Sequence, residues 1–296
     1  MKIAVTGKSG QIVTALRERG MAAGHDVIAL GRPELDLADP ASIAHALEVA
    51  APDMIVSAAA YTAVDRAEQE RSLAFAVNGT GAGAVARAAK ALGVPLVHLS
   101  TDYVFDGRLA RPYLETDTTA PTGAYGASKL AGEQAVLTEY GDNSAVLRVA
   151  WVYSPFGSNF VKTMLRLAGD RNEVSVVADQ IGNPTSAMDI SNGILIVSEN
   201  LAKRDDAALR GVFHMTASGE ASWAGFARAI FATSAAQGGH SARVKSIATS
   251  DYPTEAIRPA NSRLDCSLIK RVHGVALPDW RASLEAVVGR LQSTFV

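Results

Sequence analysis

The first half of the chain alternates short apolar segments with longer alanine-rich segments. Two of the longer segments, residues 73–92 and 129–139, have the periodicity of helices. The short segments are of strand length and apolar throughout, which is typical of parallel strands covered by helices on both faces. The pattern therefore predicts an α/β fold with a doubly wound, parallel, Rossmann-type sheet. The expected strands are residues 2–6, 26–30, 54–57, 96–100 and 145–150.

After about residue 155 the alternation becomes irregular, and loops rich in Pro, Gly and Asn follow. A helix around residues 189–199 and a strand at 211–215 still have the earlier pattern. We therefore expect residues 1–155 to form a dinucleotide-binding domain to which residues 186–215 also contribute. A smaller, interleaved C-terminal substrate lobe should comprise residues 156–185 and 216–296.

The composition excludes several classes of protein. With 28 Lys and Arg against 30 Asp and Glu, the formal net charge is −2, which argues against binding to nucleic acid or to a membrane. Cys266 is the single cysteine, and the six histidines lack metal-ligand spacing, so no metal site is expected. The chain begins directly with a strand pattern, without the features of a signal peptide. We expect a cytoplasmic protein, with Trp223, Phe226 and Phe231 in its core because they recur at helical spacing.

A glycine turn follows the first strand. Gly7 and Gly10 are spaced Gly-x-x-Gly, just before a helical stretch. Glycines at this junction permit a tight turn and let backbone N–H groups approach a pyrophosphate at the helix N-terminus. Val13 stands where such turns often have a third glycine, which mainly allows close packing of helix on strand. The turn therefore predicts a dinucleotide site.

The residue after the second strand indicates which dinucleotide binds. An acid there usually binds the ribose 2′-hydroxyl of NAD, whereas an arginine accommodates a 2′-phosphate. Here Leu30 is followed by Gly31 and Arg32, and a guanidinium matches a phosphate well. We expect Arg32 to favour NADPH, with NADH left open.

A set of hydroxyl and amine side chains follows the fourth strand. Thr101 and Asp102 lie at the strand's carboxyl end, where ligands bind in open α/β sheets. Tyr125 and Lys129 stand four residues apart at the start of a helix, so they share one face. A tyrosine can protonate a ketone oxygen, and an adjacent ammonium should lower the phenol pKa toward neutrality. We expect Thr101, Tyr125 and Lys129 to be the catalytic residues of a ketone reductase, with Thr101 positioning the substrate oxygen.

Together these motifs resemble the dTDP-4-dehydrorhamnose reductases, a family of extended short-chain dehydrogenases. The resemblance implies reduction of the C4 ketone of dTDP-4-dehydro-L-rhamnose by NAD(P)H to give dTDP-L-rhamnose for cell-surface polysaccharide. It extends over nearly the whole chain, through residues 7–11, 58–65, 100–107, 125–133, 151–153, 159–164, 179–185 and 258–265.

The resemblance also implies roles for single residues. Asn78 matches an asparagine that often orders a proton relay in short-chain dehydrogenases, although an N-cap asparagine would look the same. Arg258 lies in a matching segment of the later chain, and its guanidinium suits a diphosphate. Thr101, Asp102 and Trp151 match positions that touch the sugar nucleotide. The cofactor positions implied are Gly10, Gln11 and Ile12 at the pyrophosphate, Asp36 and Leu37 at adenine, and Ala60, Tyr61 and Thr62 beside the ribose, with Tyr125 and Lys129 at the nicotinamide side.

One departure from the family concerns assembly. Some relatives dimerise around magnesium held by glutamates, one of them on the first helix. The matching stretch here, residues 13–16, is Val-Thr-Ala-Leu and has no carboxylate. The sequence therefore favours a monomer, and a homodimer stays open.

Three alternatives use the same scaffold. A sugar-nucleotide 4,6-dehydratase would need an acid–base pair beside the threonine, but only Asp102 is present and no glutamate follows it. A sugar-nucleotide epimerase usually has paired small hydroxyl residues there. A non-catalytic regulatory subunit, like the beta subunit of methionine adenosyltransferase, tends to lose catalytic residues, whereas Thr101, Tyr125 and Lys129 are all present.

Overall fold

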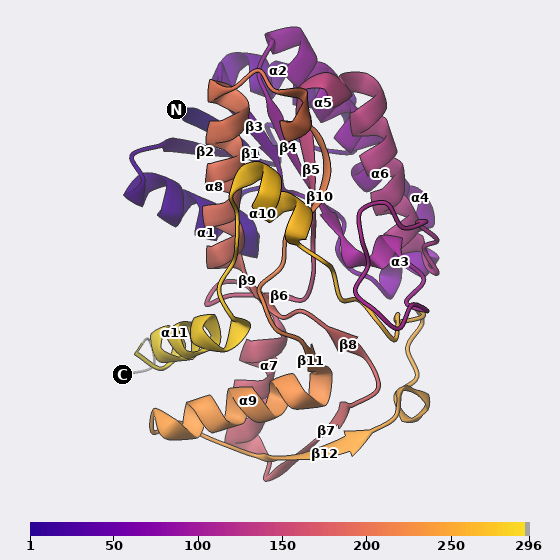
Figure 1. The fold of residues 1–296 in the computed structure, drawn as a ribbon, viewed down its shortest axis with the longest axis vertical. Helices are drawn as coiled ribbons and strands as arrows, with labels where there is room; N and C mark the ends of the chain where they lie inside the picture. The colour runs from indigo at the N-terminus through magenta and orange to yellow at the C-terminus, as the bar shows by residue number, and fades with distance from the viewer. Residues whose placement is uncertain (294–296) are drawn as a thin grey trace.

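A six-stranded parallel sheet forms the centre of the larger domain in the computed structural model, which describes residues 1–293. Its order, β2–β1–β3–β4–β5–β10, reverses direction beside β1, as in doubly wound folds (Figure 1). The predicted fold class is thus confirmed, and the predicted strands agree with the observed ones to within one residue. The strands are β1 (Lys2–Thr6), β2 (Asp26–Leu30), β3 (Met54–Ser57), β4 (Leu96–Thr101), β5 (Ser144–Val149) and β10 (Gly211–His214).

Helices cover both faces of this sheet because the strands are apolar on both sides. One face packs against α1 (Gln11–Ala22) and α8 (Ala187–Lys203), and the other against α2 (Pro40–Ala50), α5 (Gly81–Leu92) and α6 (Ala124–Tyr140) (Figure 1). The prediction of a single helix over 73–92 is wrong in detail. The observed segment consists of α4 (Arg71–Phe75), a π-helical turn η1 (Ala76–Thr80) and α5. Gly93, in the left-handed conformation, is the C-cap of α5.

The second lobe has its own core. Phe226 and Phe231 are fully buried there as expected, whereas Trp223 is only partly buried. This core lies among α7 (Phe160–Asp170), α9 (Trp223–Ala236), α11 (Trp280–Ser293) and the parallel pair β7 (Glu173–Val177) and β12 (Arg243–Ile247). The remaining elements are α3 (Arg66–Gln69), η2 (Asp102–Val104), η3 (Gly141–Asn143), β6 (Val152–Tyr153), β8 (Ile181–Gly182), β9 (Thr185–Ser186), η4 (Ala207–Leu209), β11 (Ala221–Ser222), η5 (Thr249–Asp251) and α10 (Ser267–His273).

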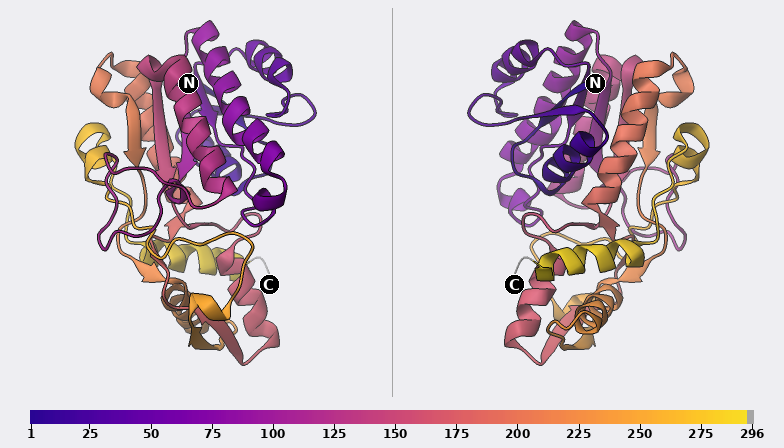
Figure 2. Two further views of the ribbon diagram at one scale, coloured as in Figure 1. Left: turned by 90° about the vertical axis from the view of Figure 1, so that its right-hand side faces the viewer. Right: turned by 90° about the vertical axis from the view of Figure 1, so that its left-hand side faces the viewer.

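The relative placement of the two parts determines where a ligand can bind. All six strands are parallel, so their carboxyl ends meet at one edge, and this edge faces the second lobe (Figure 2). Ligands of doubly wound sheets bind at this edge. Within residues 1–293, no helix has the length and apolar character needed to cross a bilayer.

Candidate active site at the carboxyl edge of the sheet

The glycine turn after β1 presents a helix N-terminus at this edge. Gly7 has φ 103°, a value that L side chains rarely adopt, and its N–H donates to the carbonyl of Leu30 at 2.5 Å. Gly10 is the N-cap of α1, with no side-chain cap and no acidic residue in the first turn. Val13 is buried and packs against Gly7 and the apolar core. The first N–H groups of α1 therefore remain available to an anion.

The side chain of Gln11 has a role that its sequence position does not reveal. Its Oε1 accepts hydrogen bonds from Ser154 Oγ at 2.8 Å and from Asn159 Nδ2 at 3.0 Å. Asn159 is also the N-cap of α7. Gln11 thus ties the glycine turn to the second lobe, and a pyrophosphate would meet the backbone N–H groups of Gln11 and Ile12. No local pattern predicts this contact.

The residues assigned to the adenosine end lie beyond β2 and β3. Arg32 is exposed, and within the described part of the chain it makes no hydrogen bond or ion pair. Asp36 uses its carboxylate to accept the N–H of Ala38 at 2.9 Å, and Leu37 is buried with its backbone against Gly81. Neighbouring Lys8 pairs with Glu34. Arg32 is therefore a free cation where a 2′-phosphate is expected.

Asn78 holds the segment that follows β3. Its Oδ1 accepts the N–H of Tyr61 at 2.8 Å, and its Nδ2 donates to the carbonyl of Tyr61 at 3.0 Å and to Ser128 Oγ at 2.9 Å. Ser128 in turn donates to the carbonyl of Tyr125 at 2.8 Å. Asn78 lies inside η1, so the N-cap alternative is wrong. Its amide joins the Ala60–Tyr61–Thr62 segment to the first turn of α6.

The three predicted catalytic residues come together at the carboxyl end of β4. Thr101 ends that strand, while Tyr125 and Lys129 lie one turn apart at the start of α6. Thr101 and Lys129 are buried and Tyr125 is partly buried, with its ring edge-on to Tyr103 at 5.5 Å between centroids. The Thr101 hydroxyl lies beside Tyr125 and lowers the pKa of its phenol.

The electrostatics of this trio differ from expectation. Burial raises the pKa of Tyr125, and the hydrogen bond with Thr101 opposes that shift only partly. Lys129 does not offset this shift, and its Nζ donates to the carbonyl of Leu99 at 2.6 Å. Burial lowers the pKa of Lys129 to about 8, against the field of Glu133. The expectation that Lys129 lowers the phenol pKa is therefore wrong for this arrangement of side chains.

A buried ion pair lies behind Lys129. Arg148 Nε and its terminal nitrogen donate to the two carboxylate oxygens of Glu133 at 2.9 and 2.7 Å, and Ser100 Oγ donates to the same carboxylate at 2.5 Å. The side chains of Glu133 and Arg148 are 2% and 4% exposed. A buried pair is stable only when its remaining hydrogen-bonding capacity is satisfied, and here it is. This pair joins α6 to β4 and β5.

Asp102, beside Thr101, is buried without such a partner. It is 3% exposed, its Oδ1 accepts from Thr101 Oγ1 at 2.9 Å, and its Oδ2 has no hydrogen-bond partner among residues 1–293. Burial raises its pKa to about 7, although nearby hydroxyl and backbone donors, Ser262 among them, oppose the shift. Asp102 thus differs from the satisfied carboxylate of Glu133.

Trp151 lies at the junction of the two parts with most of its surface covered. It has φ 47°, its ring stacks on Trp223 at 3.6 Å between centroids, and its other contacts include Gly182. Its indole N–H donates to Ser262 Oγ at 3.0 Å. Trp223, expected only in the core, supports the ring from α9.

Arg258 reaches across the junction to the first domain. It pairs with Asp65 at 2.6 Å and donates to the Tyr103 hydroxyl at 3.2 Å. The Asp65 carboxylate also accepts the N–H of Ala256 at 3.2 Å. An open hollow of about 600 Å³ adjoins this pair, lined by Asp65 and residues 252–255. Arg258 is therefore near the Tyr103–Tyr125 ring pair, and its guanidinium already has an acidic partner.

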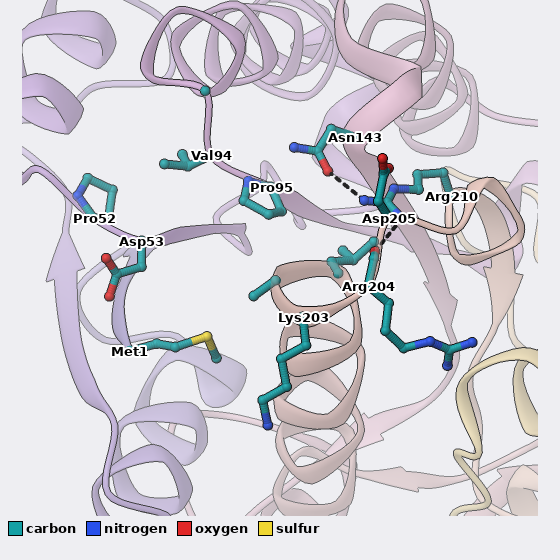
Figure 3. Close-up of a pocket in the computed structure, with 13 residues that line it drawn as sticks. Met1, Pro52, Asp53, Val94, Pro95, Asn143, Lys203, Arg204, Asp205 and Arg210 are labelled. Atoms are coloured by element: carbon teal, nitrogen blue, oxygen red, sulfur yellow. Dashed lines mark hydrogen bonds between the residues drawn. The ribbon is translucent and has the colours of Figure 1, made fainter.

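A second open hollow, of about 640 Å³, lies at the opposite, amino edge of the sheet (Figure 3). Three cations line it, and each has protein partners. Lys203 pairs with Glu199, Arg204 with Asp206, and Arg210 donates to two carbonyls and to Asn143. Together with its distance from the catalytic trio, this argues against a ligand there.

Comparison with known proteins identifies the family of this chain. The family described as RmlD substrate binding domain matches residues 1–293. A dTDP-4-dehydrorhamnose reductase of Sinorhizobium fredii is 50% identical over 291 residues, which is 98% of each chain. One of Burkholderia thailandensis is 47% identical over 300 residues, covering 99% of this chain and 100% of the relative. The chain belongs to the dTDP-4-dehydrorhamnose reductase family.

Solved structures of this family have the same fold. The reductase of Clostridium acetobutylicum superposes with a TM-score of 0.91 at 33% identity, over 99% of this chain and 100% of that one. The reductase of Bacillus anthracis, solved in complex with NADP, superposes with a TM-score of 0.89 at 35% identity, over 97% of this chain and 98% of that one. A UDP-glucose 4-epimerase of Stenotrophomonas maltophilia reaches 0.83 at 19% identity, which shows a common fold alone.

Proposed function

We propose that this protein is an NADPH-dependent reductase that converts dTDP-4-dehydro-L-rhamnose to dTDP-L-rhamnose by reducing the C4 ketone. The observation that carries the proposal is the Thr101–Tyr125 hydroxyl pair at the sheet edge that also bears the uncapped glycine turn of α1. Family membership supports the reaction and the cofactor. In its bound state, NADPH supplies the hydride.

The catalytic roles in this proposal follow from the positions of the side chains. Tyr125 donates its phenolic proton to the C4 oxygen, and Thr101 hydrogen-bonds that oxygen and orients it. Because the pKa of Tyr125 is raised, the phenol holds its proton at neutral pH. Lys129 would bind the ribose beside the nicotinamide, with its ammonium already directed by the carbonyl of Leu99.

The cofactor would lie along the carboxyl edge. Gly7, Gly10, Gln11 and Ile12 would hold the pyrophosphate by backbone N–H groups, and Arg32 the 2′-phosphate. Asp36 and Leu37 would meet the adenine, and the Ala60–Tyr61–Thr62 segment would adjoin the ribose. Asp102, Trp151 and Arg258 would contact the sugar nucleotide from both sides of the junction. The division into residues 1–155 with 186–215, and 156–185 with 216–296, is part of this proposal.

The test is NADPH oxidation with and without dTDP-4-dehydro-L-rhamnose. We expect oxidation only when the sugar is present, with one dTDP-L-rhamnose formed per NADPH consumed. An epimerase would change the sugar without net consumption of NADPH, and a regulatory subunit would bind nucleotide without turnover. A panel of other nucleotide-linked 4-keto sugars, each with NADPH and with NADH, would define the base, the sugar and the cofactor preference.

A further inference from the structure

The hydroxyl of Thr101 has a single proton, so it can donate to only one acceptor at a time. Thr101 Oγ1 donates to Asp102 Oδ1 at 2.9 Å. The same oxygen accepts the N–H of Tyr103 at 3.2 Å and lies beside the Tyr125 phenol. With its proton given to Asp102, Thr101 can act toward Tyr125 only as an acceptor. In that state Thr101 competes with the substrate ketone for the phenolic proton.

Among the residues that the structure describes, no charged partner holds Asp102 in its ionised form. The cations of the site have other partners, since Lys129 donates to Leu99 and Arg258 pairs with Asp65. Asp102 Oδ2 is buried and unpartnered within the described range, 1–293. A buried carboxyl without a charged partner is costly to ionise. Glu133, equally buried, shows the alternative, because Arg148 and Ser100 satisfy it.

We propose that Asp102 sets the direction of the Thr101 hydroxyl and that ketone reduction requires Asp102 in its protonated form. The inference rests on the proposed function and adds a positioning residue to it. When Asp102 is protonated, its O–H donates to Thr101 Oγ1. Thr101 then turns its own proton toward the ketone oxygen, and Tyr125 is free to transfer its proton to the same atom. Asp102 keeps its proton throughout, so the step needs no further reactant.

The groups around Asp102 allow this change near neutral pH. Tyr103 faces it from η2 and Tyr125 from α6, and both phenols have raised pKa values, so they stay neutral there. Ser262, from the second lobe, is not titratable. Burial raises the Asp102 pKa to about 7. Ionisation above that pH would return Thr101 to the acceptor state, and activity should fall as the pH rises.

The experiment compares the pH dependence of kcat/KM in the wild type, Asp102→Asn and Asp106→Asn, from about pH 5.5 to about pH 9.5. In the wild type, kcat/KM should fall about tenfold per pH unit once the pH exceeds the Asp102 pKa. This decline is the alkaline limb of the profile. Asp102→Asn retains the size of the side chain but cannot ionise, so we expect that limb to disappear. Asp106 lies in the same motif and bonds Tyr113, and its variant should retain the limb. A limb that persists in Asp102→Asn would overturn the proposal and assign the limb to another group, such as Lys129.

A second measurement does not depend on turnover. Wild-type protein labelled with ¹³C at the aspartate carboxyls should show a resonance that titrates close to neutral pH, and Asp102→Asn should lack it. Wild-type spectra without any such resonance would refute the inference. The two proposals fail separately. A wild type that does not oxidise NADPH with the sugar refutes the proposed function, whereas an active wild type whose limb survives in Asp102→Asn refutes only this inference.

Discussion

The two edges of the central sheet contain similar side chains in different states. At the amino edge, the cations Lys203, Arg204 and Arg210 line a wide hollow, and each is hydrogen-bonded to neighbouring carboxylates or carbonyls. At the carboxyl edge, Arg32 is exposed and Asp102 is buried, and neither Arg32 nor the Asp102 Oδ2 has a hydrogen-bond partner within the described residues 1–293. Hydrogen-bonded side chains stabilise the loops that carry them, whereas an exposed cation is open to an anionic ligand and a buried carboxyl oxygen without a donor costs stability unless a ligand compensates. Whether the polar side chains already have protein partners thus distinguishes a structural hollow from a binding site better than the volume of the hollow does.

Helix α6 joins these edges and permits a direct comparison. Tyr125 lies in its first turn beside Thr101, and Tyr140 ends it, where the hydroxyl accepts from Asn143 at 2.9 Å. Both residues are tyrosines of the same helix. Only Tyr125 faces groups that could exchange a proton with a ligand.

The largest expected effect is that of Tyr125→Phe. We expect kcat to fall at least ~100-fold, because a positioned general acid is lost, with little change in NADPH affinity. Tyr140→Phe is the control and should retain turnover within about twofold, since its hydroxyl contributes only a hydrogen bond. Stopped-flow reduction would measure both. Near-wild-type turnover in Tyr125→Phe would remove the phenol from the mechanism.

Arg32→Ala should have the next largest effect. Loss of a hydrogen-bonded charge at the 2′-phosphate should weaken NADPH binding by ~1.5–3 kcal/mol and leave NADH binding nearly unchanged. Arg204→Ala makes the same change of charge at the amino edge and should affect neither cofactor. Fluorescence titration with both cofactors would measure the difference. Equal losses for NADPH and NADH would assign Arg32 another role.

Arg258→Ala tests the junction between the two parts. If Arg258 binds the diphosphate, the apparent KM for the sugar nucleotide should rise about tenfold, or ~1.4 kcal/mol, and the affinity for NADPH should stay unchanged. Because Arg258 forms an ion pair with Asp65, the competing explanation is that Arg258 stabilises the fold and does not bind the substrate. Arg210→Ala at the amino edge should instead lower stability by roughly 1 kcal/mol or more and leave the substrate constant unchanged. A melting temperature that falls in Arg258→Ala without loss of substrate affinity would assign Arg258 to the fold.

The smallest expected effect is that of removing metal. Activity should survive excess EDTA, and the protein should sediment chiefly as a monomer. The first helix has no carboxylate at residues 13–16, and its Glu18 pairs with Arg290 of α11 at 2.8 Å. Analytical ultracentrifugation with and without EDTA provides the check. A dimer that dissociates in EDTA would contradict both expectations.

Much of the edge that carries the site was predictable because local rules govern it. Apolar strands of four to six residues that alternate with helices favour a parallel sheet, in which the carboxyl ends of the strands meet at one edge. The spacing of Tyr125 and Lys129 placed them on one face of α6. The helix over 73–92 was harder to predict, because the periodicity of a π-helical turn differs little from that of an α-helix over five residues.

The sequence by itself thus determined the sheet, the glycine turn, the common helix face of Tyr125 and Lys129, and the resemblance to a family of reductases. The tertiary structure alone decided how the side chains are partnered. Trp151 bonds Ser262 across 111 residues, and Arg258 pairs with Asp65 across 193. Such contacts depend on how two separately packed parts meet, which no local periodicity encodes. For the same reason only the fold could show that Glu133 is neutralised by Arg148, while Asp102, equally buried, has no charged partner within residues 1–293.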